Sequence, residues 1–120
     1  MKTNSPYIIN SFIQVQKITF LSDKKQLVGN LVVAGEGHGV LILYGGGASS
    51  KERFREVQEV LARGGFSSLC FDFEGVGESE GIFQDGSLSY RLQNAADAYD
   101  EFKKYVTKIS VIGSSMGEGI

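Results

Sequence analysis

Residues 40–50 read VLILYGGGASS and carry the strongest indication of the fold class. The first five are apolar or aromatic without alternation, which predicts a strand that is covered on both faces. Such a strand is typical of a parallel sheet flanked by helices. Three glycines follow it at once, so the backbone of the next loop can approach a ligand closely.

A hairpin is expected before this strand. Residues 12–21 are apolar at alternate positions, apart from one phase slip, and residues 26–33 form a second alternating run. The polar residues 22–25 separate the two runs and are typical of a turn. The pattern predicts two antiparallel strands at the start of the sheet.

A helix and another strand are expected after the glycine loop. Ser49 or Ser50 is expected to cap a helix over residues 51–63, and the glycines at positions 64 and 65 end it. The apolar residues of this helix recur at spacings of three and four: Phe54, Val57 and Leu61. Residues 66–73 form the next strand, and a glycine-rich turn follows.

A long helix and a short strand complete the pattern. Residues 85–87 can cap a helix whose apolar stripe holds one face over roughly five turns. The stripe consists of Leu88, Leu92, Ala95, Tyr99, Phe102 and Val106. Residues 108–112 form the last strand. The order predicts an α/β domain in which an antiparallel hairpin leads into a mostly parallel sheet flanked by helices.

The composition excludes several classes of protein. The 120 residues suffice for one domain, and 12 Lys+Arg against 14 Asp+Glu leave no basic stripe for nucleic acid. No apolar run is long enough for a membrane span or a signal peptide. The lone cysteine, Cys70, excludes an internal disulfide and a four-cysteine zinc site. We therefore expect a soluble, cytoplasmic protein, and no residue pattern points to a cofactor or a metal.

A G-x-S-x-G motif follows the last expected strand, at Gly113, Ser115 and Gly117. In this place the motif is typical of a nucleophile elbow, a strand-to-helix turn too tight for bulky flanking side chains that lifts the serine hydroxyl above the sheet. The backbone N–H of Met116 would then point into the same space. A glycine-rich loop without chemistry is the alternative, because the motif is short.

The glycine loop at residues 45–48 fits the same chemistry. In an acyl-transfer enzyme, a loop at this point supplies the second N–H that stabilises the oxyanion. We assign that N–H to Gly46, with Gly47 as the next choice. An ordinary strand-to-helix turn is the alternative, although one glycine would usually suffice for it.

A third motif, D-x-x-G-x-G-x-S, begins at Asp72 and ends at Ser79. With the glycine loop, this turn and the elbow in this order, the sequence resembles the α/β-hydrolase superfamily over about residues 12–120. It looks closest to the esterases, thioesterases and dienelactone-hydrolase-like members. The resemblance implies a single domain, residues 1–120, that holds the N-terminal half of the fold and ends just after the elbow.

The resemblance also implies a function. It suggests a serine hydrolase for a small-molecule ester, thioester or related acyl bond, with Ser115 as nucleophile and Met116 and Gly46 as oxyanion donors. Asp72 and Ser79 would build a structural turn near the site. The sequence departs from the family at Tyr44, where many members have His, and at Glu74, where many have Arg. Glu118 occupies a position that is often small, and these departures leave loop geometry and substrate preference open.

Two members of a catalytic triad are missing. A serine nucleophile needs a base and an acid, which in this fold follow the serine in the order Asp or Glu, then His. The one histidine, His38, precedes Ser115 and is expected at the opposite end of the sheet. We therefore expect the N-terminal half of a hydrolase of about 250 residues, inactive alone unless a complementing C-terminal half or an oligomer completes it.

Some features of the sequence also fit other functions. A Rossmann-like dinucleotide-binding unit would use Gly45 and Gly47 with Asp72 as the ribose ligand, but Ser50 stands where its third glycine belongs. A P-loop fails because Lys51 is not preceded by Gly and followed by Ser or Thr. A non-catalytic binding protein that keeps the hydrolase fold also stays open.

Overall fold

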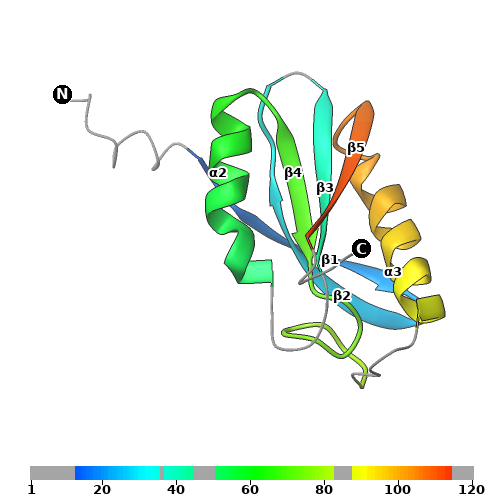
Figure 1. Cartoon of the computed structure of the whole chain (residues 1–120). Helices are drawn as coiled ribbons and strands as arrows, with labels where there is room; N and C mark the ends of the chain where they lie inside the picture. Colours follow the sequence, from blue (N-terminus) through cyan, green and yellow to red (C-terminus); the bar gives the residue numbers. More distant parts are fainter. Residues whose placement is uncertain (1–12, 36, 45–50, 83–87, 115–120) are drawn as a thin grey trace.

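The computed structural model describes residues 13–35, 37–44, 51–82 and 88–114 (Figure 1). The described part holds five strands, one 3₁₀ turn and two α-helices. In chain order they are β1 Gln16–Ser22, β2 Lys25–Val32, β3 His38–Tyr44, η1 Lys51–Phe54, α2 Arg55–Arg63, β4 Ser67–Phe71, α3 Leu88–Phe102 and β5 Lys108–Ser114. The expected elements are all present. Their ends differ by several residues from the predicted ones.

The five strands form one mixed sheet in the order β1-β2-β4-β3-β5. β3 lies between β4 and β5 and runs parallel to both, while β2 runs antiparallel to β1 and to β4. Figure 1 shows α2 and α3 on opposite sides of this sheet. The predicted fold class is therefore confirmed. The antiparallel pairing of β2 with β4 is an addition that the sequence pattern did not predict.

The hairpin between β1 and β2 forms as expected. Ser22 pairs with Lys25, so the loop has two residues, Asp23 and Lys24. Both have positive φ, 50° and 67°. Two left-handed residues in a two-residue loop match the right-handed twist of the strands.

The core lies on the central strands. Leu27, Leu31 and Leu69 are fully buried, and the strand of residues 40–44 is covered as predicted, with Leu41 and Ile42 each 1% exposed. Cys70 is buried and free, as expected for a packing residue. Residues 72 and 73 leave β4 for the turn, so the strand is shorter than predicted.

The predicted face of α2 was partly wrong. Phe54 is buried and Leu61 is partly buried, but Val57 is 39% exposed. Gln58 takes the buried position, and its amide nitrogen donates to the Asn30 carbonyl at 3.0 Å and to Ser68 Oγ at 2.9 Å. The helix therefore presents a hydrogen-bonding side chain to polar groups on β2 and β4. The expected caps at positions 49 and 50 lie outside the described residues.

The predicted stripe of α3 was also partly wrong. Leu92 is 61% exposed and Tyr99 is 37% exposed, whereas Asn94, Ala98 and Phe102 are fully buried. These three are spaced by four residues and so share one face. Asn94 is buried without penalty because it accepts from the Glu74 N–H and donates to Ser22 Oγ. The helix ends at Phe102, so Val106 reaches the core from the turn that follows, and the Leu88 side chain lies outside the description.

Candidate active site

The carboxyl ends of β3 and β5 lie side by side. Tyr44, the last residue of β3, pairs with Ser114, the last residue of β5. Gly45 and Ser115 are each one peptide bond further along the chain. Paired strands in a sheet are about 4.8 Å apart. The segments that carry the expected nucleophile and oxyanion donor thus start from neighbouring points.

The expected site residues themselves lie mostly outside the described part of the chain. This holds for Gly46, Ser115, Met116 and Gly117, and their roles stay predictions. Gly113 is described, within β5. No described atom comes within 4 Å of a Cβ placed on it, so its expected steric role in a tight turn also stays a prediction.

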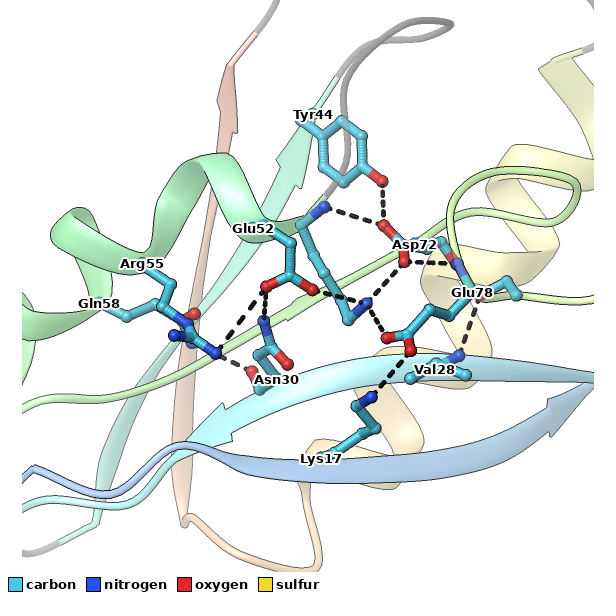
Figure 2. Close-up of polar contacts among 11 residues, drawn as sticks. Lys17, Val28, Asn30, Tyr44, Glu52, Arg55, Gln58, Asp72 and Glu78 are labelled. Atoms are coloured by element: carbon cyan, nitrogen blue, oxygen red, sulfur yellow. Dashed lines mark hydrogen bonds and ion pairs between the residues drawn. The ribbon is translucent and has the colours of Figure 1, made fainter.

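Asp72 is the centre of a polar cluster next to Tyr44, at the carboxyl end of β3 (Figure 2). Its side chain is 0% exposed. Oδ1 accepts from the Tyr44 hydroxyl and from the main-chain N–H of Lys51, each at 2.8 Å. Oδ2 accepts from the ammonium of Lys51 at 2.8 Å and from the main-chain N–H of Glu78 at 3.0 Å. Four donors therefore satisfy this buried carboxylate.

Lys51 is the cation of the cluster. Its side chain is 1% exposed, and its ammonium lies 2.8 Å from Asp72, 2.7 Å from Glu78 and 3.1 Å from Glu52. Burial opposes the charged form, but the hydrogen bonds to Asp72, Glu78 and Glu52 outweigh it and raise the pKa of Lys51. The ammonium thus stays protonated at any physiological pH.

Glu78 joins the cluster to the surface. Lys17 on β1 binds its second oxygen at 2.8 Å, and both of these side chains are about half exposed. The hydrogen bonds from Lys17 and then Lys51 lower the pKa of Glu78 to about 2. Positive and negative side chains therefore alternate along this series of contacts, which runs from Lys17 through Glu78 and Lys51 to Asp72 (Figure 2).

Tyr44 is held at both its side chain and its main chain. Burial, reinforced by the charge of Asp72, raises the pKa of its hydroxyl, which stays a donor. Arg91 on α3 donates to the Tyr44 carbonyl at 3.0 Å, and its guanidinium lies 4.4 Å from the centre of the Phe73 ring. The tyrosine that replaces the family's histidine thus ends β3 in a fixed geometry.

The D-x-x-G-x-G-x-S motif forms a turn around Asp72. The Ser79 hydroxyl donates to the Asp72 carbonyl and accepts from the Val28 N–H at 2.9 Å, which ties the turn to β2. Gly77 has φ +53°, and a Cβ there would collide with the Asp72 carboxylate. These contacts agree with the structural role expected for Asp72 and Ser79.

Glu74 stands where the family often has Arg, and it is buried. Its side chain lies 3.4 Å from the ammonium of Lys25 through one oxygen. The other oxygen has no hydrogen-bond partner among the described residues. The glutamate therefore places in this turn a buried carboxylate of which one oxygen faces Lys25, at the start of β2, and the other lacks a hydrogen-bond donor among the described residues.

His38 lies far from the carboxyl ends of β3 and β5, as expected. It begins β3 and pairs with Lys108, six residues before Ser114 along the parallel neighbour. Its ring nitrogen Nε2 lies 2.9 Å from Ser110 Oγ, and its ring packs edge-on against Phe66. His38 therefore cannot serve a nucleophile at the opposite end of the sheet.

The alternatives based on nucleotide binding find no support here. Asp72 has no free oxygen for a ribose, and the Lys51 ammonium is enclosed by carboxylates instead of facing a phosphate. No group of three His, Cys, Asp or Glu in the described ranges could hold a metal ion. None of the helices described is long and apolar enough to cross a membrane.

Sequence reasoning missed Lys51 as a site residue. In the sequence, Lys51 stands only at the lysine position of a P-loop motif that fails, and no motif assigns a role to Arg91 or Glu78. The one available signal was the position of Lys51 directly after the glycine loop. That position did not reveal its burial, because the burial depends on contacts with the next strand and its turn.

Solved structures of known proteins share this fold. An esterase of Pyrococcus furiosus superposes with a TM-score of 0.75 at 22% identity, over 93% of this chain and 46% of its own. Est1E of Butyrivibrio proteoclasticus, with ferulic acid bound, gives 0.72 at 30% identity, over 83% and 43%. A putative hydrolase of Agrobacterium vitis gives 0.68 at 28% identity, over 88% and 41%. No family model and no curated protein sequence matches the chain.

The chain spans less than half the length of these structures. The described strands and helices therefore correspond to the N-terminal part of an α/β-hydrolase fold, which confirms the resemblance found in the sequence. Its structural neighbours include esterases and other hydrolases, among them an epoxide hydrolase of Vigna radiata at 17% identity and a TM-score of 0.69.

Proposed function

We propose that this chain carries the nucleophile and the oxyanion donors of a serine hydrolase that cleaves an ester, thioester or related acyl bond. The observation that carries the proposal is the pairing of Tyr44 with Ser114. It starts the glycine loop and the G-x-S-x-G segment from adjacent points at the same edge of the sheet. A nucleophile and an oxyanion donor must meet within a few ångström of one carbonyl group.

Each residue has a stated role in this proposal. The Ser115 hydroxyl oxygen attacks the acyl carbon, and a base accepts its proton. The N–H groups of Met116 and Gly46 donate to the oxygen that becomes negative, and each is worth a few kcal/mol in the transition state. The bond to the leaving alcohol or thiol then breaks, and water releases the acyl group from the serine.

The base and the acid of the triad must come from outside residues 1–120. His38, the one histidine of this sequence, lies at the opposite end of β3 from Tyr44, the residue that pairs with Ser114. We therefore expect residues 1–120 alone to show no turnover above background. A turnover assay of residues 1–120 tests this expectation. The intact mass of the native product adds a second test: a mass near 25–35 kDa would mean a longer chain that holds the base, and 13.0 kDa would mean either a complementing partner or a remnant without hydrolase activity.

The catalytic proposal is tested by labelling the native product with a fluorophosphonate. We expect one adduct, at Ser115, which Ser115→Ala abolishes. Ser114→Ala is the matched control, because it removes the same hydroxyl one residue earlier, and it should keep the label. A folded native product that takes no label at Ser115 would show a non-catalytic binding protein that keeps the hydrolase fold.

A further inference from the structure

Both residues that flank segment 45–50 bind the same carboxylate. Tyr44 precedes the segment and donates its hydroxyl to Asp72 Oδ1, and Lys51 follows it and donates its main-chain N–H to the same oxygen, each at 2.8 Å. The ammonium of Lys51 adds a third bond, to Oδ2, at 2.8 Å. A single buried side chain, in the turn that follows β4, thus binds both residues that flank the segment.

These contacts are strong because they exclude water. Asp72 and Lys51 are 0% and 1% exposed, and Tyr44 is 4% exposed. A hydrogen bond that involves an ionised group in such a place is shorter and stronger than one between neutral groups. Asp72 is itself fixed by its turn, through the Glu78 N–H and the Ser79 hydroxyl.

The main chain at the start of the segment has a further tie. Arg91 donates to the Tyr44 carbonyl, which belongs to the peptide that leads into Gly45. The two flanks are therefore held by Asp72, in the turn after β4, and by Arg91 on α3. None of these contacts involves the segment 45–50 itself.

We propose that Tyr44, Lys51 and Asp72, which we name the Asp72 anchor, are positioning residues that set where the Gly46 N–H meets the oxyanion. The inference rests on the proposed function, since it needs Gly46 as a donor. Its residues touch neither the substrate nor the reacting atoms. They act by fixing the two ends of the chain segment that carries the donor.

The inference predicts a particular kinetic signature. A donor that is displaced by a fraction of an ångström still lets substrate bind but stabilises the transition state less. Loss of one anchor bond should therefore lower kcat by about 10- to 100-fold and leave KM within about twofold. Affinity for a trifluoromethyl ketone, which forms an oxyanion when it binds a serine, should fall by the same factor as kcat/KM.

The experiment uses the native product in three variants. Tyr44→Phe removes one hydroxyl, and Lys51→Met removes the ammonium with little change of length. Lys17→Met is the matched control: it removes a lysine that also binds Glu78 but does not contact Asp72. Active sites are counted from the amount of fluorophosphonate adduct at completion, so misfolded molecules do not enter kcat. Tyr44→Phe is the milder variant if Lys51→Met folds poorly.

The outcomes separate the two proposals. Labelling of the wild type at Ser115 tests the proposed function first, and its absence rejects that function. With labelling present, reduced kcat and ketone affinity in both anchor variants, but not in Lys17→Met, support the anchor. Wild-type kcat per active site and wild-type ketone affinity in Tyr44→Phe and Lys51→Met would overturn it, even if both variants unfold more easily.

The double variant gives a second check. Because both residues act through Asp72, the combined loss in Tyr44→Phe with Lys51→Met should fall short of the product of the single losses. Fully multiplicative losses would contradict a shared anchor.

Discussion

Lys51 binds Asp72 twice, through its main-chain N–H to Oδ1 and through its ammonium to Oδ2, both at 2.8 Å. Both side chains are buried, so water does not compete for these hydrogen bonds. A buried pair of this kind is costly to break from one side, since the remaining charge loses its partner. We therefore expect the pair to stabilise this end of the sheet.

Asp72→Asn should destabilise the protein strongly. The substitution keeps the shape but leaves the Lys51 ammonium without its buried counter-ion, and we expect a loss of about 3–5 kcal/mol. Urea unfolding measures it. The matched control is Asp100→Asn on α3, where the same change removes an exposed ion pair with Lys103. Equal losses at the two positions would contradict the role of burial.

Glu78 should make the protein sensitive to acid. Its pKa is lowered from 4.5 to about 2 in the folded state, so its contribution is present above pH 4.5 and is lost as the pH falls toward 2. In Glu78→Gln, the free energy of unfolding should fall less steeply with decreasing pH across this window. The difference in slope should correspond to at most one proton taken up on unfolding. Because Glu78 is exposed, about 1 M salt should reduce the difference between variant and wild type. Parallel stability curves at low salt would refute the assignment.

Gln58 should not tolerate a charge. Its side chain is fully buried, its nitrogen donates to Asn30 O and Ser68 Oγ, and its oxygen has no partner among the described residues. Gln58→Glu removes the donor and buries a carboxylate beside carbonyl groups, so we expect about 2–4 kcal/mol of destabilisation at pH 7.

The pH dependence of Gln58→Glu is its own control. Burial would raise the pKa of the new carboxyl in the folded state, so the penalty should appear as the pH rises above the unfolded value of about 4.3. Unfolding measured at pH 4 should recover most of the loss. A penalty of the same size at pH 4 and pH 7 would point to lost packing in place of charge.

Gly39 should be intolerant of a side chain. A Cβ on this residue of β3 would lie 2.6 Å from Phe102 Cζ and 3.0 Å from Val106. Gly39→Ala must push the buried ring of Phe102 aside, and we expect a loss of about 1–3 kcal/mol. Gly64→Ala is the control, since its nearest contacts are 3.5 Å and its φ is negative. Thermal unfolding of both variants measures the two losses. An unchanged Tm for Gly39→Ala would show that the Phe102 ring can move aside without cost.

Local pattern alone determined the strands and the fold class. An unbroken apolar run can be satisfied only where both faces of a strand are covered, and residues 40–44 are covered. Alternation and a polar turn likewise specified the hairpin of β1 and β2. The order of the glycine motifs resembles that of the hydrolase fold. In the described turn, Gly77 has φ +53°, and a Cβ there would collide with the Asp72 carboxylate.

The tertiary structure alone decided which helix faces are buried and where the charges meet. Periodicity predicts that Val57, Leu92 and Tyr99 are buried, but all three are exposed. Gln58 and Asn94 are buried instead, because each forms hydrogen bonds with polar groups of the sheet or its turns. Lys51 looks like a surface residue in the sequence. It is buried because the order β4-β3 brings a carboxylate 21 residues away against it, and a buried charge is tolerated only with such a partner.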